Sequence, residues 1–543
     1  MLDELDPGRI ADPAQRRAVG ELLNLVEGQA AQIAGLQAEV QRLRDALAHL
    51  KGEQGRPRVL ANKRPAPSDH SSEQERREPR PGWHKGPKQA KLVIDRTEER
   101  RLDQAVLPAD AVFKGYAEVV VQEVTLRPEI IRFRCERWYS PGERQTYQAP
   151  LPPGYHGQFG PGLGALALYL TYETNVSQAK LLALFSSVGV DLSAGHLAAL
   201  LTEQPALAAE YDAICLAGLG SSAYQHIDET PTRVGGVTRH CHLLSAPRYT
   251  AYRTTPGLDR QAVLDVLRAG RPRCFRLNAV AWAFLDQGKL PKRTRAGLLA
   301  AAQDQDFDAP SFQALLEPLV PASHPALRRF VLEGAAIGAY QAQTAAPVIR
   351  TLIADGAWAW QSLTEQYQLC WVHEGRHYKK LCPVLAVHRD LLTATSDDFW
   401  AYYRDLRAYQ AAPTTAEAVR LATAFDTLFG RVTGYAALDD CLRRTLGRKT
   451  ALLLALAHPE LPLHNNPAEL AARRRVRKRD ASFGARSEAG IAAWDALQTI
   501  LATANQLGVN ALHYLQDRLS TAYHLPALAD LIAQPAATCP APP

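Results

Sequence analysis

The amino-acid sequence predicts a multidomain α/β protein in which a mixed sheet is interrupted by helical insertions. Two observations lead to this fold class. An apolar heptad repeat near the N-terminus is followed by a polar, proline-containing segment, which indicates a separate helix and a linker. Further along, short apolar runs that end in an acidic residue alternate with stretches of helical character. With 543 residues, 46% hydrophobic and 22% charged, the chain can form several domains.

Residues 1–50 are predicted to form a coiled-coil helix that associates with a second copy. β-branched residues at most first heptad positions, with leucine at most fourth positions, favour a parallel two-stranded coiled coil. The alternative is an amphipathic helix that folds back onto its own chain. The first positions are Val19, Val26, Ile33, Val40 and Leu47, and the fourth positions are Leu22, Gln29, Leu36, Leu43 and Leu50.

Residues 51–101 are predicted to be a basic, flexible linker. The segment contains six prolines and few apolar residues, and its 14 Lys and Arg outnumber its 8 Asp and Glu. The rest of the chain is balanced, so this segment holds the whole net charge of +6. Such a tether attracts nucleic acid irrespective of base sequence, although a merely solvated linker has the same composition.

The cysteines and the N-terminal residues indicate in which cellular compartment the protein is expected. Eight cysteines are scattered without a CxxC pair, which is typical of a reducing compartment rather than of a disulfide scaffold. The first residues, MLDELDPGRIADP, are acidic and polar, unlike a signal peptide. No apolar run reaches the roughly 18 residues that a membrane span needs. We therefore expect a cytoplasmic protein without a membrane partner.

Two small regions precede the largest domain. Residues 102–150 are predicted to be a small β module, with strands at 118–126 and 129–139. Residues 151–215 are predicted to be helical, with a glycine-containing break in the middle. A helix-turn-helix would place Ser193–Leu201 in the major groove of DNA, but any helical bundle can be connected in the same way.

Apolar runs then predict the strands of a larger domain. Strands are expected at 224–228, 237–244, 248–253 and 348–354, with a helix at 257–269 after the third strand. Three strands, a helix and a strand that ends in an acid follow the order of a ribonuclease-H-like core. In this interpretation the core begins over 216–384 with an extra helical segment at 271–345, and is followed by a helical insertion at 385–460, C-terminal helices at 461–525 and a disordered tail at 526–543.

Three acidic residues stand where such a core would hold metal ions. Asp228 is predicted to close the first strand and Asp355 the fourth, while Glu469 would reach them from a later helix. Two divalent cations about 4 Å apart need hard oxygen ligands, which three carboxylates can supply. Each strand-end acid also has a plainer interpretation, Asp228 as a strand-to-turn cap and Asp355 as half of an Asp-Gly turn.

The stretch 461–484, LPLHNNPAELAARRRVRKRDASFG, places one carboxylate beside a dense cationic run. Asn466 is the expected N-cap, Pro467 suits the first helical position, and Glu469 falls where a capping-box glutamate belongs. The plainer interpretation is a capped surface helix in which Glu469 satisfies its own backbone and pairs with Arg473.

Four motifs resemble, in the same order, the landmarks of insertion-sequence-66 family transposases, which are of the DDE type. Each motif is unspecific alone, and their conjunction carries the resemblance, which extends over most of the chain. The C-terminal run LQTILATANQLGVNALHYLQDRL also resembles the family's last helical segment. The four motifs are HIDETPTRV at 226–234, LIADGAWAW at 352–360, CWVHEGRHYKKL at 370–381 and HNNPAELAARRRVRKRDASFG at 464–484.

The resemblance implies a DNA transposase that transfers phosphoryl groups with two metal ions, Mg²⁺ or Mn²⁺. Asp228, Asp355 and Glu469 would be both the catalytic residues and the metal ligands. Activated water would nick the ends of the element, and the freed 3′-hydroxyl would attack target DNA. Asn465, Asn466 and His373 would support the site, and DNA phosphates would be held by Arg473, Arg474, Arg475, Arg477, Lys478 and Arg479.

The implied partners are double-stranded DNA (terminal repeats and target), a second copy of the chain through the coiled coil, and helper proteins from the same element. The implied location is the bacterial nucleoid. Four features depart from the family. Cys135 alone stands where the family commonly has cysteine pairs, His464 stands where it often has Asp, Leu470 stands where it often has Arg, and residues 271–345 are extra sequence. A catalytically silent or domesticated DNA-binding protein and a nuclease of the same fold therefore remain as alternatives.

Cys370, His373, His377 and Cys382 have a spacing that a tetrahedral zinc site could use. Only Cys370 and His373 match the family motif. We therefore expect a buried packing segment, in which His373 could contact a phosphate, and no zinc.

Overall fold

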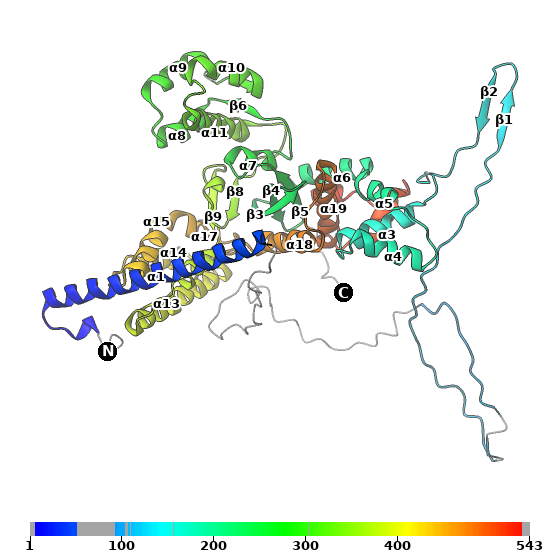
Figure 1. Cartoon of the computed structure of the whole chain (residues 1–543), viewed down its shortest axis with the longest axis horizontal. Helices are drawn as coiled ribbons and strands as arrows, with labels where there is room; N and C mark the ends of the chain where they lie inside the picture. The colour runs from blue at the N-terminus through cyan, green and yellow to red at the C-terminus, as the bar shows by residue number, and fades with distance from the viewer. Residues whose placement is uncertain are drawn as a thin grey trace.

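The computed structural model describes residues 6–51, 93–103, 107–108, 110–155, 157–302 and 304–534. The predicted flexibility of the linker over 52–92 and of the tail over 535–543 concerns residues outside this part of the chain. The described residues form a mixed α/β structure around a five-stranded sheet (Figure 1).

The central sheet has the strand order β5-β4-β3-β8-β9. The first three strands in sequence are antiparallel neighbours, whereas β8 runs parallel to both β3 and β9. A two-residue turn joins β3 to β4, where Gly235 and Gly236 adopt the positive φ angles that such hairpin turns require. The strands are β3 (Tyr224–Val234), β4 (Val237–Ala246), β5 (Tyr249–Thr255), β8 (Thr351–Ala354) and β9 (Gln366–Leu369).

The predicted end of the first strand at Asp228 is wrong. β3 continues to Val234, because it pairs with β4 along the whole hairpin. Its pairing with β8 ends earlier, at His226 opposite Ile353. Asp228 therefore lies within β3, just past the point where its parallel neighbour leaves the sheet.

Two long C-terminal helices cover the sheet. α18 (Asn466–Ser482) packs on β3 and β4, and α19 (Glu488–Gln506) runs along the edge strand β5. Side chains of α19 satisfy the outward N–H groups of this edge: Thr499 accepts from Tyr252 at 3.0 Å and Asp495 from Thr254 at 2.7 Å. The edge of the sheet is therefore closed by a helix rather than open to water.

The segment predicted as extra, 271–345, folds as a compact unit between β5 and β8. Its two short strands pair with each other and not with the central sheet. α11 crosses from this unit back to β8. The elements from β5 onward are α7 (Arg260–Leu267), β6 (Cys274–Arg276), α8 (Ala279–Gln287), α9 (Lys292–Ala302), β7 (Asp306–Asp308), α10 (Ala309–Leu319) and α11 (Pro325–Ala342).

Residues 385–460 are helical as predicted and have a core of their own. Trp371, fully buried at the start of α12, anchors this core among the rings of Phe399, Phe425 and Phe429, and its indole N–H donates to the Leu452 carbonyl at 2.9 Å. After the short η5 (Trp358–Trp360) the helices are α12 (Trp371–Lys379), α13 (Ala386–Ala411), α14 (Thr415–Phe429), α15 (Ala436–Gly447), α16 (Lys449–Leu452) and α17 (Leu454–Ala457).

The N-terminal helix α1 (Pro13–Leu50), preceded by η2 (Pro7–Arg9), lies against this helical insertion (Figure 1). Leu23 is fully buried, and the buried Glu27 accepts backbone N–H groups at the start of α13 and lies 3.2 Å from His388 Nδ1. The first half of the helix thus folds onto its own chain. The second half leaves its heptad residues Ile33, Leu36, Val40, Leu43 and Leu47 exposed.

The predicted strand pair at 118–126 and 129–139 is also wrong. The described part of this region is extended up to Glu136, and the hairpin lies later, with β1 (Arg137–Ser140) and β2 (Gln145–Gln148) around a Pro-Gly turn. Val119, Val121 and Val124 are exposed, and this segment pairs with no strand in the described part of the chain. The hairpin projects from the body in Figure 1.

The helical region 151–215 is present, with the predicted break before Ser193, whose hydroxyl caps α5 by accepting from His196 N–H. Its helices are α3 (Pro161–Tyr172), α4 (Gln178–Ser187), α5 (Ala194–Thr202) and α6 (Pro205–Leu219). None of the helices within the described ranges combines the length and apolar character needed to cross a membrane.

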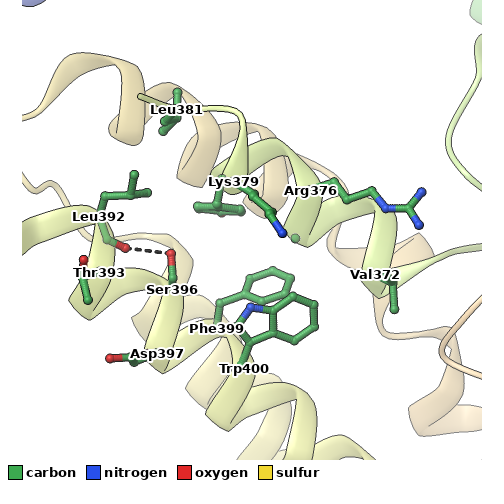
Figure 2. A pocket seen from close by; sticks show the side chains of 12 residues that line it. Val372, Arg376, Lys379, Leu381, Leu392, Thr393, Ser396, Asp397, Phe399 and Trp400 are labelled. Atoms are coloured by element: carbon green, nitrogen blue, oxygen red, sulfur yellow. Dashed lines mark hydrogen bonds between the residues drawn. The ribbon is translucent and has the colours of Figure 1, made fainter. Parts of the chain in front are cut away.

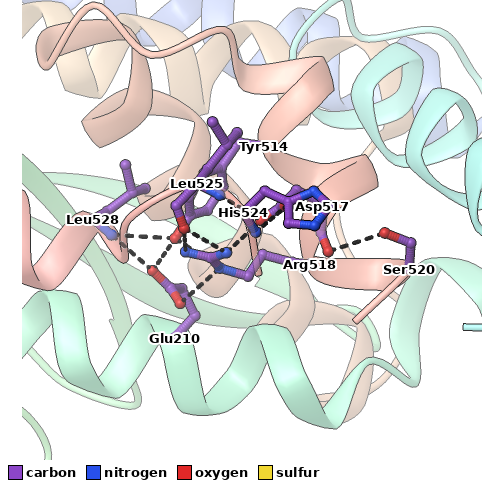
Figure 3. Close-up of polar contacts among 8 residues, drawn as sticks. All are labelled: Glu210, Tyr514, Asp517, Arg518, Ser520, His524, Leu525 and Leu528. Atoms are coloured by element: carbon purple, nitrogen blue, oxygen red, sulfur yellow. Dashed lines mark hydrogen bonds and ion pairs between the residues drawn. The ribbon is translucent and has the colours of Figure 1, made fainter. Parts of the chain in front are cut away.

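A buried polar cluster ties the C-terminus to α6 (Figure 3). Arg518 donates to the Leu525 carbonyl at 3.1 Å and pairs with Asp517 at 2.6 Å, while Glu210 of α6 accepts from the Leu528 N–H. These contacts hold α20 (Ala511–Leu519) and α21 (Leu528–Ala533). The tail predicted to be disordered from residue 526 therefore begins with an ordered helix.

Candidate active site

Parallel pairing brings Asp228 and Asp355 to neighbouring positions. His226 of β3 lies opposite Ile353 of β8, and each acid follows two residues later, Asp228 within β3 and Asp355 directly after the end of β8. Residues two apart on a strand face the same side, so the two carboxylates leave the sheet at one point. This is the juxtaposition that the sequence predicted, although it arises within β3 rather than at its end.

Asp228 faces α18. Its partner across the hairpin, Leu243, packs against Ala471 of that helix, and cross-strand partners share a face of the sheet. Burial raises the pKa of the Asp228 carboxyl to about 7, and the negative charges of Asp355 and Glu469 act in the same direction. The N–H of Glu229, which donates to Asp228 Oδ1 at 2.8 Å, opposes this rise.

Asp355 is oriented by the turn that follows β8. Its Oδ1 accepts from the N–H of Ala357 and from the indole N–H of Trp360, both at 3.1 Å. Gly356 has a φ of +103°, and a Cβ at this position would lie 3.1 Å from Leu369. The turn therefore requires glycine and holds one carboxylate oxygen of Asp355 in place.

Glu469 projects from the first turn of α18 and is 9% exposed. Its Oε2 accepts from Arg376 Nη2 at 3.0 Å, and its Oε1 lies 3.5 Å from His373 Nδ1, too far for a hydrogen bond. Oε1 and that Nδ1 are both buried, and neither has a hydrogen-bond partner among the residues that the structure describes. The carboxylate thus turns toward α12 rather than back onto its own helix or toward Arg473.

The predicted N-cap is displaced by one residue. Asn465 precedes the helix and Asn466 is its first residue, and the cap makes no side-chain bond to the helix. The Asn465 amide instead donates to the Ile227 carbonyl at 2.8 Å and lies 3.1 Å from His226 Nδ1. Fully buried, Asn465 fastens the start of α18 to β3 beside Asp228, while Asn466 is buried in the same turn.

The four residues of the zinc hypothesis do not converge in the structure. Among the described residues, Cys370 and His373 instead come together with Glu469, with one potential ligand atom from each within 4.8 Å of the others. Cys382 is exposed, and its thiol points to the Lys380 carbonyl. Burial raises the pKa of the Cys370 thiol to about 12, which disfavours the thiolate that a metal would need.

The carboxylates fit a divalent cation better than that cluster does. The charges of Asp355 and Glu469 help to raise the pKa of Asp228, and Glu469 Oε1 is a buried acceptor that receives no hydrogen bond from the described residues. Hard cations such as Mg²⁺ prefer carboxylate oxygens and relieve the repulsion among them. Asp228, Asp355 and Glu469 are therefore the residues that could hold such an ion.

The six cations of α18 differ in burial: two are buried and four keep some exposure. Arg475 is fully buried, ion-paired with Asp495 and placed over the rings of Tyr252 and Trp494. Lys478 is also buried and donates to the Thr171 carbonyl at 2.7 Å; its burial lowers its pKa to about 8. The prediction that these two bind DNA therefore conflicts with their structural role.

The other four cations keep some exposure. Arg473 and Arg477 are exposed and lie one helical turn apart. Arg474 pairs with Glu173 at 3.2 Å, and Arg479 donates to the Pro231 carbonyl. The exposed surface of the run is therefore centred on Arg473 and Arg477.

Arg376 is the residue of this site that the sequence analysis missed. It comes from α12, one turn after His373, and its Nη1 lies 2.7 Å from His373 Nε2. Burial, followed by the charge of Arg376, lowers the pKa of His373, which keeps this imidazole neutral. The only sequence signal was the segment HEGRH, in which an arginine stands at helical spacing from a predicted site histidine.

Comparison with known proteins agrees with the resemblance of the motifs. The model of a family described as Transposase IS66 family matches residues 339–493, which include Asp355, His373 and Glu469. The chain is also 30% identical over 329 residues to uncharacterized protein y4jO of Sinorhizobium fredii (strain NBRC 101917 / NGR234), across 56% of this chain and 94% of that protein. The chain belongs to the IS66 family of transposases.

Proposed function

We propose that this transposase is of the DDE type and that Asp228, Asp355 and Glu469 hold two divalent ions, Mg²⁺ or Mn²⁺, for phosphoryl transfer on DNA. The observation that carries the proposal is the meeting of Asp228 on β3, Asp355 just after β8 and Glu469 on α18, close enough for both neighbours to raise the pKa of Asp228. The strand order is that expected of a ribonuclease-H-like core, which supports the same assignment.

The chain's own residues prepare this site in three ways. Trp360 and the Ala357 N–H fix one oxygen of Asp355, so the other oxygen has a set direction. Asn465 ties α18 to β3, which aims Glu469 at the sheet. Arg376 balances the charge of Glu469. When bound, divalent cations would activate the attacking oxygen and stabilise the leaving oxygen of a phosphodiester.

The product of nicking, a 3′-hydroxyl, would attack target DNA at the same site, since the same cation pair serves both displacements. Arg473 and Arg477, exposed on α18 after Glu469, would hold backbone phosphates near the carboxylates. Arg474 and Arg479 contribute at the edge of this surface. These contacts position DNA without selecting its sequence, so recognition of terminal repeats requires other parts of the chain, such as the α4–α5 pair, or helper proteins of the element.

The exposed second half of α1 supports association of two copies through a coiled coil. Its heptad residues are apolar and uncovered within the described part of the chain. Two copies would allow the two ends of an element to be held in one complex.

The decisive experiment measures metal-dependent nicking of element-end DNA by the wild type and by Asp355→Asn and Glu469→Gln. We expect nicking with Mg²⁺ or Mn²⁺ by the wild type, and only background nicking by both variants, with DNA binding retained. Asp286→Asn, an exposed acid of α8 paired with Arg295, is the matched control and should remain active.

The other outcomes have definite meanings. Equal loss of DNA binding in both variants would assign the acids a structural role. Nicking without any joined product in a strand-transfer assay would indicate a nuclease. End binding without cleavage, even with the element's helper proteins added, would indicate a silent DNA-binding protein.

A further inference from the structure

A cavity of about 260 Å³ lies between helices α12 and α13 (Figure 2). Its walls combine aromatic, cationic and acidic groups. α12 supplies Arg376 and Lys379, and α13 supplies Ser396, Asp397 and Trp400. The three acids of the candidate active site are not among its lining residues, so it is a separate site.

The cavity is nevertheless one side chain away from the carboxylates. Arg376 lines it and also donates to Glu469 at 3.0 Å. α12 follows directly after β9, the neighbour of the strand that precedes Asp355. A DNA strand whose phosphate lay at Glu469 would therefore pass close to the cavity.

Trp400 has a fixed place in the wall. Its ring packs edge-to-face with Phe399 at 4.9 Å and with Tyr403 at 5.6 Å. Its edge lies against the backbone of α12 at Gly375, where an added Cβ would be only 2.7 Å from the indole. The absence of a side chain at Gly375 thus makes room for a large, rigid aromatic surface beside the cations.

The chemistry of the wall matches one unstacked nucleotide. An indole gives a base a stacking surface, the Lys379 cation suits the adjoining phosphate, and the Asp397 carboxylate can accept from a base N–H. Arg376 lines the wall with its side chain while its guanidinium stays on Glu469 and His373. The cavity volume is below the roughly 300–1,000 Å³ typical of sites for drug-sized ligands. It therefore suits a small group such as a single base better than a larger ligand.

We propose that this cavity receives one extrahelical nucleotide of the DNA substrate beside the bond to be cut. The proposal rests on the proposed function, because it takes DNA at Glu469 as given. A base removed from the stack beside the scissile bond would free the backbone to bend toward the carboxylates. A protein segment is the other occupant that an aromatic and polar cavity could take, and the test separates the two.

The experiment measures the affinity of the full-length protein for element-end duplexes in Ca²⁺, which is chosen to support binding without cleavage. Each duplex of the series carries a single abasic site at a different position around the cleavage point. We expect one position at which loss of the base weakens wild-type binding roughly tenfold, the scale of one lost stacking contact. The Trp400→Leu variant should bind intact DNA about tenfold more weakly than the wild type does. An abasic site at the sensitive position should not weaken its binding any further.

Trp282→Leu, at a half-buried tryptophan of α8 outside the cavity, is the control and should keep the wild-type profile. The Asp397→Asn variant should show a weaker preference for a particular base at the sensitive position. The Asp398→Asn variant should keep the wild-type preference, because the Asp398 carboxylate pairs with Arg431 instead. If Trp400→Leu is unstable, Thr393→Trp fills the cavity from an exposed position and should abolish the abasic effect by itself.

An identical abasic profile in the wild type and in both cavity variants would overturn the inference while leaving the proposed function intact. The same holds for a wild-type profile without a sensitive position. If the cavity variants bind single ends normally but fail to assemble two ends, the occupant is a protein segment. Absence of metal-dependent cleavage by the wild type would defeat the proposed function instead.

Discussion

Asp228 is a residue of the site whose pKa is shifted by its surroundings. Its pKa rises from an ordinary 3.8 to about 7, chiefly because it is buried and further because Asp355 and Glu469 are negative. A proton or a bound cation relieves the same repulsion, so the two compete for this carboxyl group. Metal binding should therefore weaken as the pH falls below 7.

We predict that Asp228→Asn stabilises the metal-free protein above pH 7 and leaves its stability near pH 4 unchanged. Because the pKa is higher in the folded chain than in the unfolded chain, the folded state holds more protons between pH 4 and 7. Wild-type stability therefore decreases as the pH rises through this window. Three pKa units correspond to at most about 4 kcal/mol, and asparagine removes this loss.

Thermal unfolding in EDTA at pH 4.5, 6 and 8 checks this prediction. The Tm of Asp228→Asn should exceed that of the wild type by a few degrees at pH 8, and the difference should shrink toward pH 4.5. Asp286→Asn should show no such dependence. A constant difference at all three pH values would assign the effect to packing rather than to charge.

At the scale of the element, the run of cations on α18 consists of an inner, buried set and an outer, exposed set. Its inner residues, Arg475 and Lys478, hold the helix to α19 and α3 through buried contacts with Asp495 and Thr171. Its outer residues, Arg473 and Arg477, face solvent. The helix that carries Glu469 is thus anchored by the same kind of side chain that it exposes to solvent.

We predict that Arg473→Glu combined with Arg477→Glu weakens DNA binding and reduces the slope of log K against log salt by about 2, one unit for each lost phosphate contact. The Tm should change little, because both residues are exposed. Arg475→Met should do the opposite, lowering the Tm and leaving the slope unchanged. Binding isotherms at several salt concentrations measure this, with Lys292→Glu and Arg293→Glu on α9 as the charge-matched control. An unaltered slope in the first variant would remove this surface from the DNA interface.

The same helix shows which features the sequence could predict. The strands and the approach of Asp228 to Asp355 follow from local apolar runs and from parallel pairing, so they were predictable. The burial of Arg475 was not, since its aromatic and acidic partners come from β5 and α19, and a run of cations alone indicates a solvated face. Arg376 reaches Glu469 across 93 residues, a contact that only the tertiary fold creates. The strands predicted at 118–139 failed because β propensity without a partner does not form a sheet.

At the scale of the whole molecule, α1 joins the helical insertion to a stripe of exposed apolar residues on which we expect a second copy to dock. Its first half is fixed by Glu27, which accepts from the Val384 and Leu385 N–H groups, and by Asn24, which accepts from the Ala436 N–H and donates to the Gly434 carbonyl. Its second half presents apolar heptad residues to solvent. A coiled coil formed there would set the position of the insertion, and of the cavity between α12 and α13, relative to the partner copy.

We predict that the protein is a dimer and that Leu36→Asp combined with Leu43→Asp makes it a monomer. Both leucines are more than half exposed in the single chain, and burying them against a second helix removes apolar surface from water, whereas two aspartates on the seam would repel their copies. Light scattering should give about twice the chain mass of 59.6 kDa for the wild type and one chain mass for the variant. Glu39→Ala combined with Arg42→Ala, an exposed ion pair of the same helix off the heptad seam, is the control and should remain dimeric. A dimer that survives both aspartates would locate the interface elsewhere, and a wild-type monomer would mean that the exposed stripe of α1 serves another partner.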